Sequence, residues 1–126
     1  MAKRVPELAN VPEPTAPYSP CVEASGLIFI SGQAGRDPES GTPQAVAEQT
    51  RVAMRRIGTI LRDLGLGFEH LVKTSVFLTD ISDFGEFNAA YGEFFTGPPP
   101  ARTTVEVSAL PKPEFRVEIE AVATRD

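Results

Sequence analysis

The chain has 126 residues, of which 41% are hydrophobic and 23% are charged. This length and composition are typical of one folded globular domain and exclude a wholly disordered chain. The formal net charge is −5, and no run of Lys or Arg exceeds a pair, so the basic footprint that binds nucleic acid is missing. We therefore expect a single domain over residues 1–126 with no nucleic-acid partner.

Apolar runs in the sequence are short, and metal-ligating residues are scarce. The longest run, residues 27–30, cannot span a membrane, and residues 1–10 lack the apolar core of a signal peptide. We expect a cytoplasmic protein with no membrane partner. Cys21 and His70 are the only cysteine and histidine, which excludes an internal disulfide and the usual zinc-ligand sets. We therefore expect no metal and no cofactor, although a dyad of Cys21 or a serine with His70 stays open.

The first twenty residues are predicted to be extended chain with turns. Five prolines fall within the first twenty residues and exclude a regular helix there. Residues 22–31 are predicted as a strand, and Gly32 in the segment that follows indicates exposed backbone at a sheet end. Residues 37–43 are rich in turn-forming types and predict a loop.

An amphipathic helix is predicted next, because apolar residues recur at helical spacing over residues 46–64. Thr42-Pro43 offers a cap and a first-turn proline, and Gly65 supplies the stop. Residues 71–79 are rich in β-branched types and predict a strand.

The last third predicts a helix and two strands. Asp83 and Glu86 have the spacing of a capping box, so a second helix is expected to start there and to end before the prolines at 98–100. Residues 102–108 and 116–123 alternate apolar and polar side chains, as strands do. The element order indicates an α+β sandwich in which both helices pack on one face of a single mixed sheet.

The two C-terminal strands carry charged residues opposite to their valines. If the valine-bearing faces cover the helices, Arg102 points to the helix-free face of the sheet, where Glu118 or Glu120 could approach it. The alternative is a solvated face with surface ion pairs of little energetic value. The helix-free face also carries apolar material around Phe29 and Phe77, which indicates a protein that is not a monomer.

Six sequence blocks, from about Ala16 onward, carry a family resemblance. The blocks are Pro17–Pro20, Ile30–Gln33, Asp83–Phe95, Pro100–Val107, Leu110–Lys112 and Val117–Ala121. In order and spacing they resemble the RidA/YjgF reactive intermediate deaminase family. The resemblance implies a chorismate-mutase-like α+β fold, a homotrimer with a cleft at each subunit boundary, and cofactor-independent hydrolysis of 2-iminobutanoate/2-iminopropanoate-type imines and enamines to 2-keto acids and ammonia.

The resemblance also implies roles for individual residues. Arg102 would anchor the substrate carboxylate, for which a planar guanidinium is suited. Glu118 would activate the attacking water, and the hydroxyl of Tyr18 would hydrogen-bond substrate or water. Many family members carry a cysteine where this chain has Thr104, which puts the substrate preference in doubt. The implied substrate-binding residues besides Arg102 are Ser31, Gly32, Phe87, Asn88 and Thr104.

Two other functions stay open at this point. The same cleft could belong to a non-catalytic ligand-binding or chaperone-like protein, although the presence of both Arg102 and Glu118 argues against it. An acidic group beside a bound carboxylate would repel it unless that group performs chemistry or faces the imine end. A related hydrolase acting on another carboxylate-bearing substrate is the second alternative.

Overall fold

A single mixed sheet is the centre of the computed structural model, which describes residues 2–126. Its strand order is β1-β2-β5-β3-β4, and only β3 and β4 are parallel neighbours. The predicted α+β class with one mixed sheet is therefore confirmed. The strands are β1 (Cys21–Ala24), β2 (Leu27–Ala34), β3 (Leu71–Leu78), β4 (Ala101–Glu106) and β5 (Val117–Thr124).

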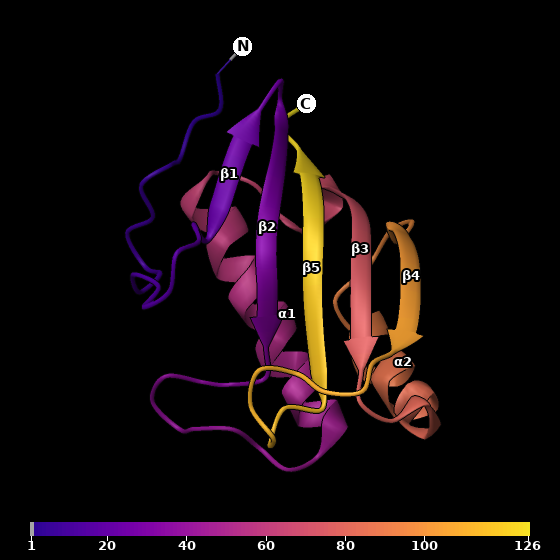
Figure 1. Ribbon diagram of the computed structural model, residues 1–126. Coiled ribbons are helices and arrows are strands. Elements are labelled where there is room, and N and C mark those ends of the chain that lie inside the picture. The colour runs from indigo at the N-terminus through magenta and orange to yellow at the C-terminus, as the bar shows by residue number, and fades with distance from the viewer. Residues whose placement is uncertain (1) are drawn as a thin grey trace.

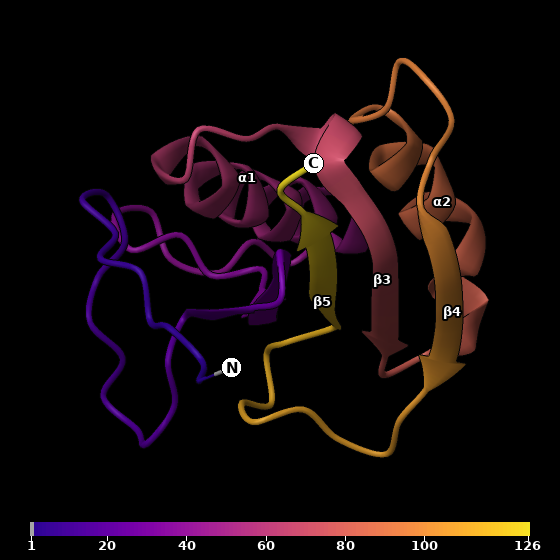
Figure 2. The ribbon, with the colours of Figure 1, turned by 90° about the horizontal axis from the view of Figure 1, so that it is seen from above.

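Two helices cover one face of this sheet, as predicted. They are α1 (Val46–Asp63) and α2 (Phe84–Gly92). A short 3-10 turn, η1 (Phe68–His70), follows α1, and another, η2 (Ile81–Asp83), precedes α2. Figure 1 looks onto the helix-free face, and Figure 2 shows both helices on the same side of the strands. No helix within residues 2–126 is long and apolar enough to cross a membrane.

The core lies between the sheet and the two helices. Alternate residues of the central strand β5, such as Val117 and Ile119, are completely buried against α1. On α1 the buried residues recur at helical spacing, as the sequence predicted. Gly65, with φ of 76°, ends the helix in the left-handed conformation that glycine adopts without strain.

The strand predicted over residues 22–31 is instead a hairpin. Ser25 and Gly26 both have positive φ, 54° and 77°, and they join β1 to its antiparallel neighbour β2. This pair of positive φ angles matches the twist of two flanking strands. The sequence prediction was wrong here because it read the Ser-Gly dipeptide as part of a continuous strand.

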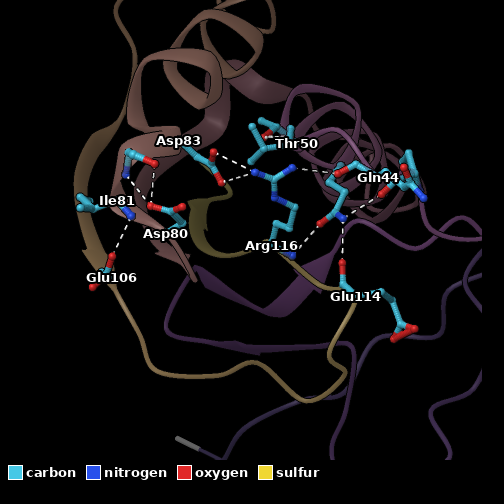
Figure 3. Close-up of polar contacts among 12 residues, drawn as sticks. Gln44, Thr50, Asp80, Ile81, Asp83, Glu106, Glu114 and Arg116 are labelled. Carbon is cyan, nitrogen blue, oxygen red and sulfur yellow. Dashed lines mark hydrogen bonds and ion pairs between the residues drawn. The ribbon is translucent and has the colours of Figure 1, made fainter.

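Both helices begin where the sequence predicted, but their predicted side-chain caps are absent. At α1 the cap residue is Ala45, which makes no side-chain cap, so Thr42 does not cap the helix. At α2, Asp83 makes no cap hydrogen bond. Its carboxylate accepts two hydrogen bonds from the guanidinium of Arg116, at 2.8 and 2.9 Å (Figure 3). The capping spacing was therefore present, but a partner from a distant part of the chain takes the carboxylate.

The helix-free face of the sheet carries exposed apolar side chains. Phe29 of β2 is 45% exposed and Val105 of β4 is 41% exposed. Val105 is paired in register with the partly buried Phe77 of β3. Exposed large apolar side chains gathered on one face are a feature of protein–protein contact surfaces.

Candidate active site

Arg102 lies on the helix-covered side of the edge strand β4. It is paired in register with Thr74, whose buried side chain bonds the hydroxyl of Tyr91 in α2 at 2.7 Å. The guanidinium carbon of Arg102 is 5.6, 5.2 and 5.0 Å from the ring centres of Phe84, Phe87 and Tyr91. These rings form a shelf that holds the cation by its attraction to aromatic faces.

Arg102 has no carboxylate partner within residues 2–126. Its side chain is partly buried, so the charge is neither neutralised nor fully hydrated. A guanidinium stacked on rings keeps its in-plane N–H donors free, and these donors match the two oxygens of a carboxylate. The geometry suits an anchor for a carboxylate ligand.

Two polar atoms beside this arginine lack partners. Asn88 lies one helical turn after Phe84, on the same side of α2 as the ring shelf. Thr104 lies on the same side of β4 as Arg102. The Asn88 Oδ1 and Thr104 Oγ1 atoms are buried without a hydrogen-bond partner. Because an unpaired buried polar atom costs about 1–3 kcal/mol, a bound ligand is a natural explanation for both.

Phe87 does not offer surface to a substrate. Its side chain is completely buried, and the ring lies 5.2 Å from the guanidinium carbon of Arg102. Phe87 therefore supports Arg102 in this chain, and its contact with a substrate stays a prediction. We call Arg102, Asn88 and Thr104 the arginine half-site.

Glu118 lies on the opposite, helix-free face of the sheet. Its strand neighbours Val117 and Ile119 are buried against the helices, so Glu118 points the other way, toward the side of Phe77. Burial raises the pKa of the Glu118 carboxyl, and the negative charge of Glu120 adds to the effect. A raised pKa brings a carboxyl closer to the range in which it exchanges protons at neutral pH.

A β-bulge of β2 brings backbone against this carboxyl. The pairing of β2 with β5 shifts between Ile30 and Gln33, which places Ser31 and Gly32 in the irregular stretch. A Cβ on Gly32 would lie 2.5 Å from the Oε2 atom of Glu118, so a larger residue would displace the carboxyl from this position. The sequence predicted a sheet end at Gly32, but β2 continues to Ala34, and Gly32 instead lies in a bulge within the strand.

The N-terminal segment reaches the same bulge. The hydroxyl of Ser31 donates to the carbonyl oxygen of Ser19 at 2.6 Å, which holds the neighbouring Tyr18 near this end of β2. Tyr18 is 57% exposed, so its hydroxyl is open to a ligand. We call Tyr18, Ser31, Gly32 and Glu118 the glutamate half-site.

The two half-sites do not meet within one chain. Arg102 faces α2 and Glu118 faces away from both helices, so the sheet separates them. The prediction that Arg102 points to the helix-free face was wrong. The alternation along β4 was read correctly, but Val105 is the residue that faces outward. The signal that was missed is the spacing of Phe84, Phe87 and Tyr91 on one side of α2, which forms a shelf for a cation.

The Cys21 form of the alternative nucleophilic dyad has no support in the structure. Cys21 is 1% exposed, and burial raises the pKa of its thiol, which is the opposite of what a nucleophile needs. The Nδ1 atom of His70 accepts the backbone N–H of Gly67 at 3.1 Å, within the turn that precedes β3. Cys21 therefore packs in the core, and His70 holds the turn before β3.

Comparison with known proteins identifies relatives over almost the whole chain. The chain is 42% identical over 125 residues to the mouse protein named 2-iminobutanoate/2-iminopropanoate deaminase, covering 98% of this chain and 92% of that protein. The human protein of the same name is 43% identical over 125 residues, covering 98% of this chain and 90% of that protein.

Solved structures give the same result. A Yersinia pestis protein of the conserved Rid family, YyfA, superposes with a TM-score of 0.90 at 38% identity, covering 98% of this chain and 99% of that one. TdcF of E. coli with bound serine superposes with a TM-score of 0.89 at 33% identity over the same shares of the two chains. The family model described as Endoribonuclease L-PSP matches residues 8–125. The chain therefore belongs to the endoribonuclease L-PSP family, in agreement with the RidA/YjgF resemblance of its sequence blocks.

Proposed function

We propose that this protein is a deaminase that hydrolyses small 2-imino acids, and the enamines in equilibrium with them, to 2-keto acids and ammonia. The observation that carries the proposal is the pair of half-sites, one with an unneutralised arginine and one with a carboxyl of raised pKa. Relatives at 42–43% identity over 98% of the chain are named for this reaction. We expect the protein to act in the cytoplasm.

In the proposed mechanism the arginine half-site binds the substrate. The guanidinium of Arg102 pairs with the two carboxylate oxygens, and the ring shelf keeps it in position. Asn88 and Thr104 supply the two unpartnered polar atoms for the remainder of the ligand. Binding the carboxylate at a fixed point also fixes the imine carbon relative to the attacking water.

The glutamate half-site performs the proton transfers. Water adds to the C=N bond, and one of its protons passes through the Glu118 carboxylate to the nitrogen, giving a carbinolamine. Transfer of the remaining hydroxyl proton to nitrogen then breaks the C–N bond and leaves the 2-keto acid and ammonia. We expect the hydroxyl of Tyr18 to hydrogen-bond the water or the substrate. The reaction uses no oxidant, reductant or further reactant.

We propose a homotrimer in which each active site combines the arginine half-site of one subunit with the glutamate half-site of the next. The sheet separates the two half-sites within a chain, so a neighbouring copy is the simplest way to bring them together. The exposed Phe29 and Val105 on the helix-free face provide apolar surface for the contact. The number three comes from the family resemblance stated for the sequence.

Activity is tested by generating imines in solution with an amino acid oxidase and following their decay with and without the protein. We expect faster conversion to the keto acid, with rates that differ among the parent amino acids. The matched control is Arg102→Ala, which should leave only the spontaneous rate. Equal rates with the protein, the variant and buffer alone would refute the proposal.

Assembly is tested separately by light scattering coupled to size exclusion. We expect a species of three times the 13.6 kDa chain mass. Mixing an Arg102→Ala variant with a Glu118→Gln variant should restore part of the activity, because some clefts then combine two intact half-sites. A fully active species of one chain's mass would refute both the trimer and the shared site.

A further inference from the structure

The arginines of this chain fall into two groups. Arg4, Arg51, Arg116 and Arg125 each form an ion pair with a carboxylate. The other five make no such pair with any residue from 2 to 126. One of the five is Arg102 of the candidate active site, and the remaining four are Arg36, Arg55, Arg56 and Arg62.

Three of these unpaired arginines line one groove beside α1, between the N-terminal segment and the end of β2. Arg55, Arg56 and Arg62 border a cavity of about 350 Å³. Arg55 and Arg62 are separated by seven residues, or about two helical turns, so they share one side of the helix. The chain has a net charge of −5, whereas the lining of this groove has three arginines and one aspartate.

The walls of the groove are held by specific contacts. On one side the backbone N–H and the side-chain amide of Asn10 donate to the Asp63 carboxylate at 2.9 and 2.7 Å, which fixes the N-terminal segment to the end of α1. On the other side Asp37 is the one carboxylate of the lining. Its Oδ1 atom accepts the backbone N–H groups of Glu39 and Ser40, and these bonds lower the pKa of Asp37.

The lining combines positive charge with apolar surface. Val11, Pro12 and Ile60 contribute to the walls, and the volume lies at the lower end of the range of small-molecule sites, about 300–1,000 Å³. A single carboxylate would satisfy one guanidinium. Arg55 and Arg62 form no ion pair, although Arg55 lies near enough to Asp37, and Arg62 near enough to Asp63, to help lower the pKa of those carboxyls. A phosphate monoester carries a charge of about −1.5 to −2 at neutral pH and three acceptor oxygens, so it matches two such guanidinium groups.

We propose that this groove is a second binding site, separate from the active site, for a small organic phosphate monoester with an apolar or ring-shaped body. Arg55 and Arg62 bind the phosphate, and the apolar walls contact the body of the ligand. Arg56 has a structural part in addition. Its guanidinium donates to Gln33 Oε1 at 3.0 Å and to the Arg36 carbonyl oxygen at 2.6 Å, so it holds the end of β2 against α1.

The test is calorimetric titration of the full-length protein with phenyl phosphate, inorganic phosphate and benzoate. We expect saturable binding of phenyl phosphate at one site per chain, with weaker binding of inorganic phosphate, which lacks the apolar body, and of benzoate, which has one negative charge. The Arg55→Ala, Arg62→Ala double variant should bind phenyl phosphate about tenfold or more weakly while hydrolysing imines at the unchanged rate. Arg56 is left intact in this variant because of its contacts to β2.

Two further variants locate the binding. Arg51→Ala changes an arginine of the same helix that is already paired with Glu48 and Glu93, and it should retain the affinity. Arg102→Ala should also retain it, since the active site is elsewhere. No saturable binding, equal affinity for benzoate, unchanged affinity in the double variant, or loss of binding in Arg102→Ala would each overturn the proposal.

Discussion

Two pairs of oppositely charged residues differ in this molecule: one pair forms an ion pair, and the other is kept apart. Arg116 and Asp83 form a two-point ion pair at 2.8 and 2.9 Å that joins the start of β5 to the start of α2 (Figure 3). Arg116 also donates to the Gln44 carbonyl oxygen at 3.0 Å. Arg102 and Glu118, in contrast, lie on opposite faces of the sheet, and neither side chain has a charged partner within residues 2–126.

The difference separates a structural role from a chemical one. Arg116 and Asp83 neutralise each other, so neither charge needs a ligand as its partner. Arg102 is held by aromatic faces, which leave its N–H donors free. Glu118 is held in a partly buried place beside Gly32, which raises its pKa. Keeping the two apart within a chain prevents a salt bridge that would remove both from the chemistry.

The largest expected effect comes from removing the unpaired arginine. Arg102→Ala should lower kcat/KM at least a hundredfold, because two charge-assisted hydrogen bonds are each worth about 1.5–3 kcal/mol. The thermal midpoint of the variant should change little, since no ion pair is lost. Steady-state kinetics and a thermal melt of the same preparation make the measurement. Near-normal turnover by the folded variant would remove Arg102 from the substrate site.

The second effect concerns the unpaired carboxyl. Glu118→Gln keeps the shape of the side chain but removes the proton acceptor, so we expect turnover to fall about a hundredfold, within the usual range for a general base. Binding of a 2-keto acid product should change much less. Turnover from single-turnover kinetics is compared with the product Kd. An equal loss in both quantities would point to a role in shaping the pocket.

The pH dependence follows from the raised pKa of Glu118. The reaction needs the carboxylate form, so activity should fall as the pH drops through a value above the ordinary 4.5 of a glutamate. Glu120→Gln removes the second cause of the rise, and this acidic limb should move to lower pH without returning to the ordinary value, because burial persists. The profile of kcat/KM against pH in the two proteins makes the test, and an unmoved limb would contradict it.

The protonation of Glu118 should affect folding stability and activity in opposite directions. A pKa raised in the folded state gives stability that is present at low pH and is lost as the pH rises through that pKa. Glu118→Gln should therefore unfold at a higher temperature than the parent at pH 7, with the difference vanishing in acid. Thermal melts at the two pH values measure it. A less stable variant at pH 7 would show that the carboxylate has a stabilising partner in the assembled protein.

The paired arginine should give the reverse result of Arg102. Arg116→Ala leaves the largely covered Asp83 carboxylate without its partner, and we expect a loss of about 1–2 kcal/mol in the free energy of unfolding. The thermal midpoint should fall by several degrees, while kcat/KM of the folded protein stays within about twofold. An Asp83→Asn, Arg116→Ala double variant should lose less than the two single losses added together. An Arg116→Ala variant that lost activity but kept its stability would contradict the structural role assigned to Arg116.

The sequence predicted much of the fold but not the geometry of the site. Helical and alternating periods located both helices and the strands after residue 70, because burial on one face imposes these patterns. Alternation does not say which face of a strand meets the helices, so Arg102 was assigned to the wrong side. Nothing local in Asp83 reveals that Arg116 will take its carboxylate. The periodicity of residues 46–64 does not show what lies beside the arginines of α1, and only the folded N-terminal segment makes them part of a groove.

The smallest expected effect tests the ring shelf that distinguishes Arg102 from Arg116. Phe84 is 41% exposed, and its ring centre lies 5.6 Å from the guanidinium carbon of Arg102. An interaction of this kind at an exposed site is worth about 0.5–1 kcal/mol, so Phe84→Leu should raise KM about two- to fivefold with little change in kcat. Phe84→Tyr keeps the aromatic face and should keep the parent KM. If the leucine variant matched the tyrosine variant, Phe87 and Tyr91 alone would be sufficient to hold the arginine ready for a carboxylate.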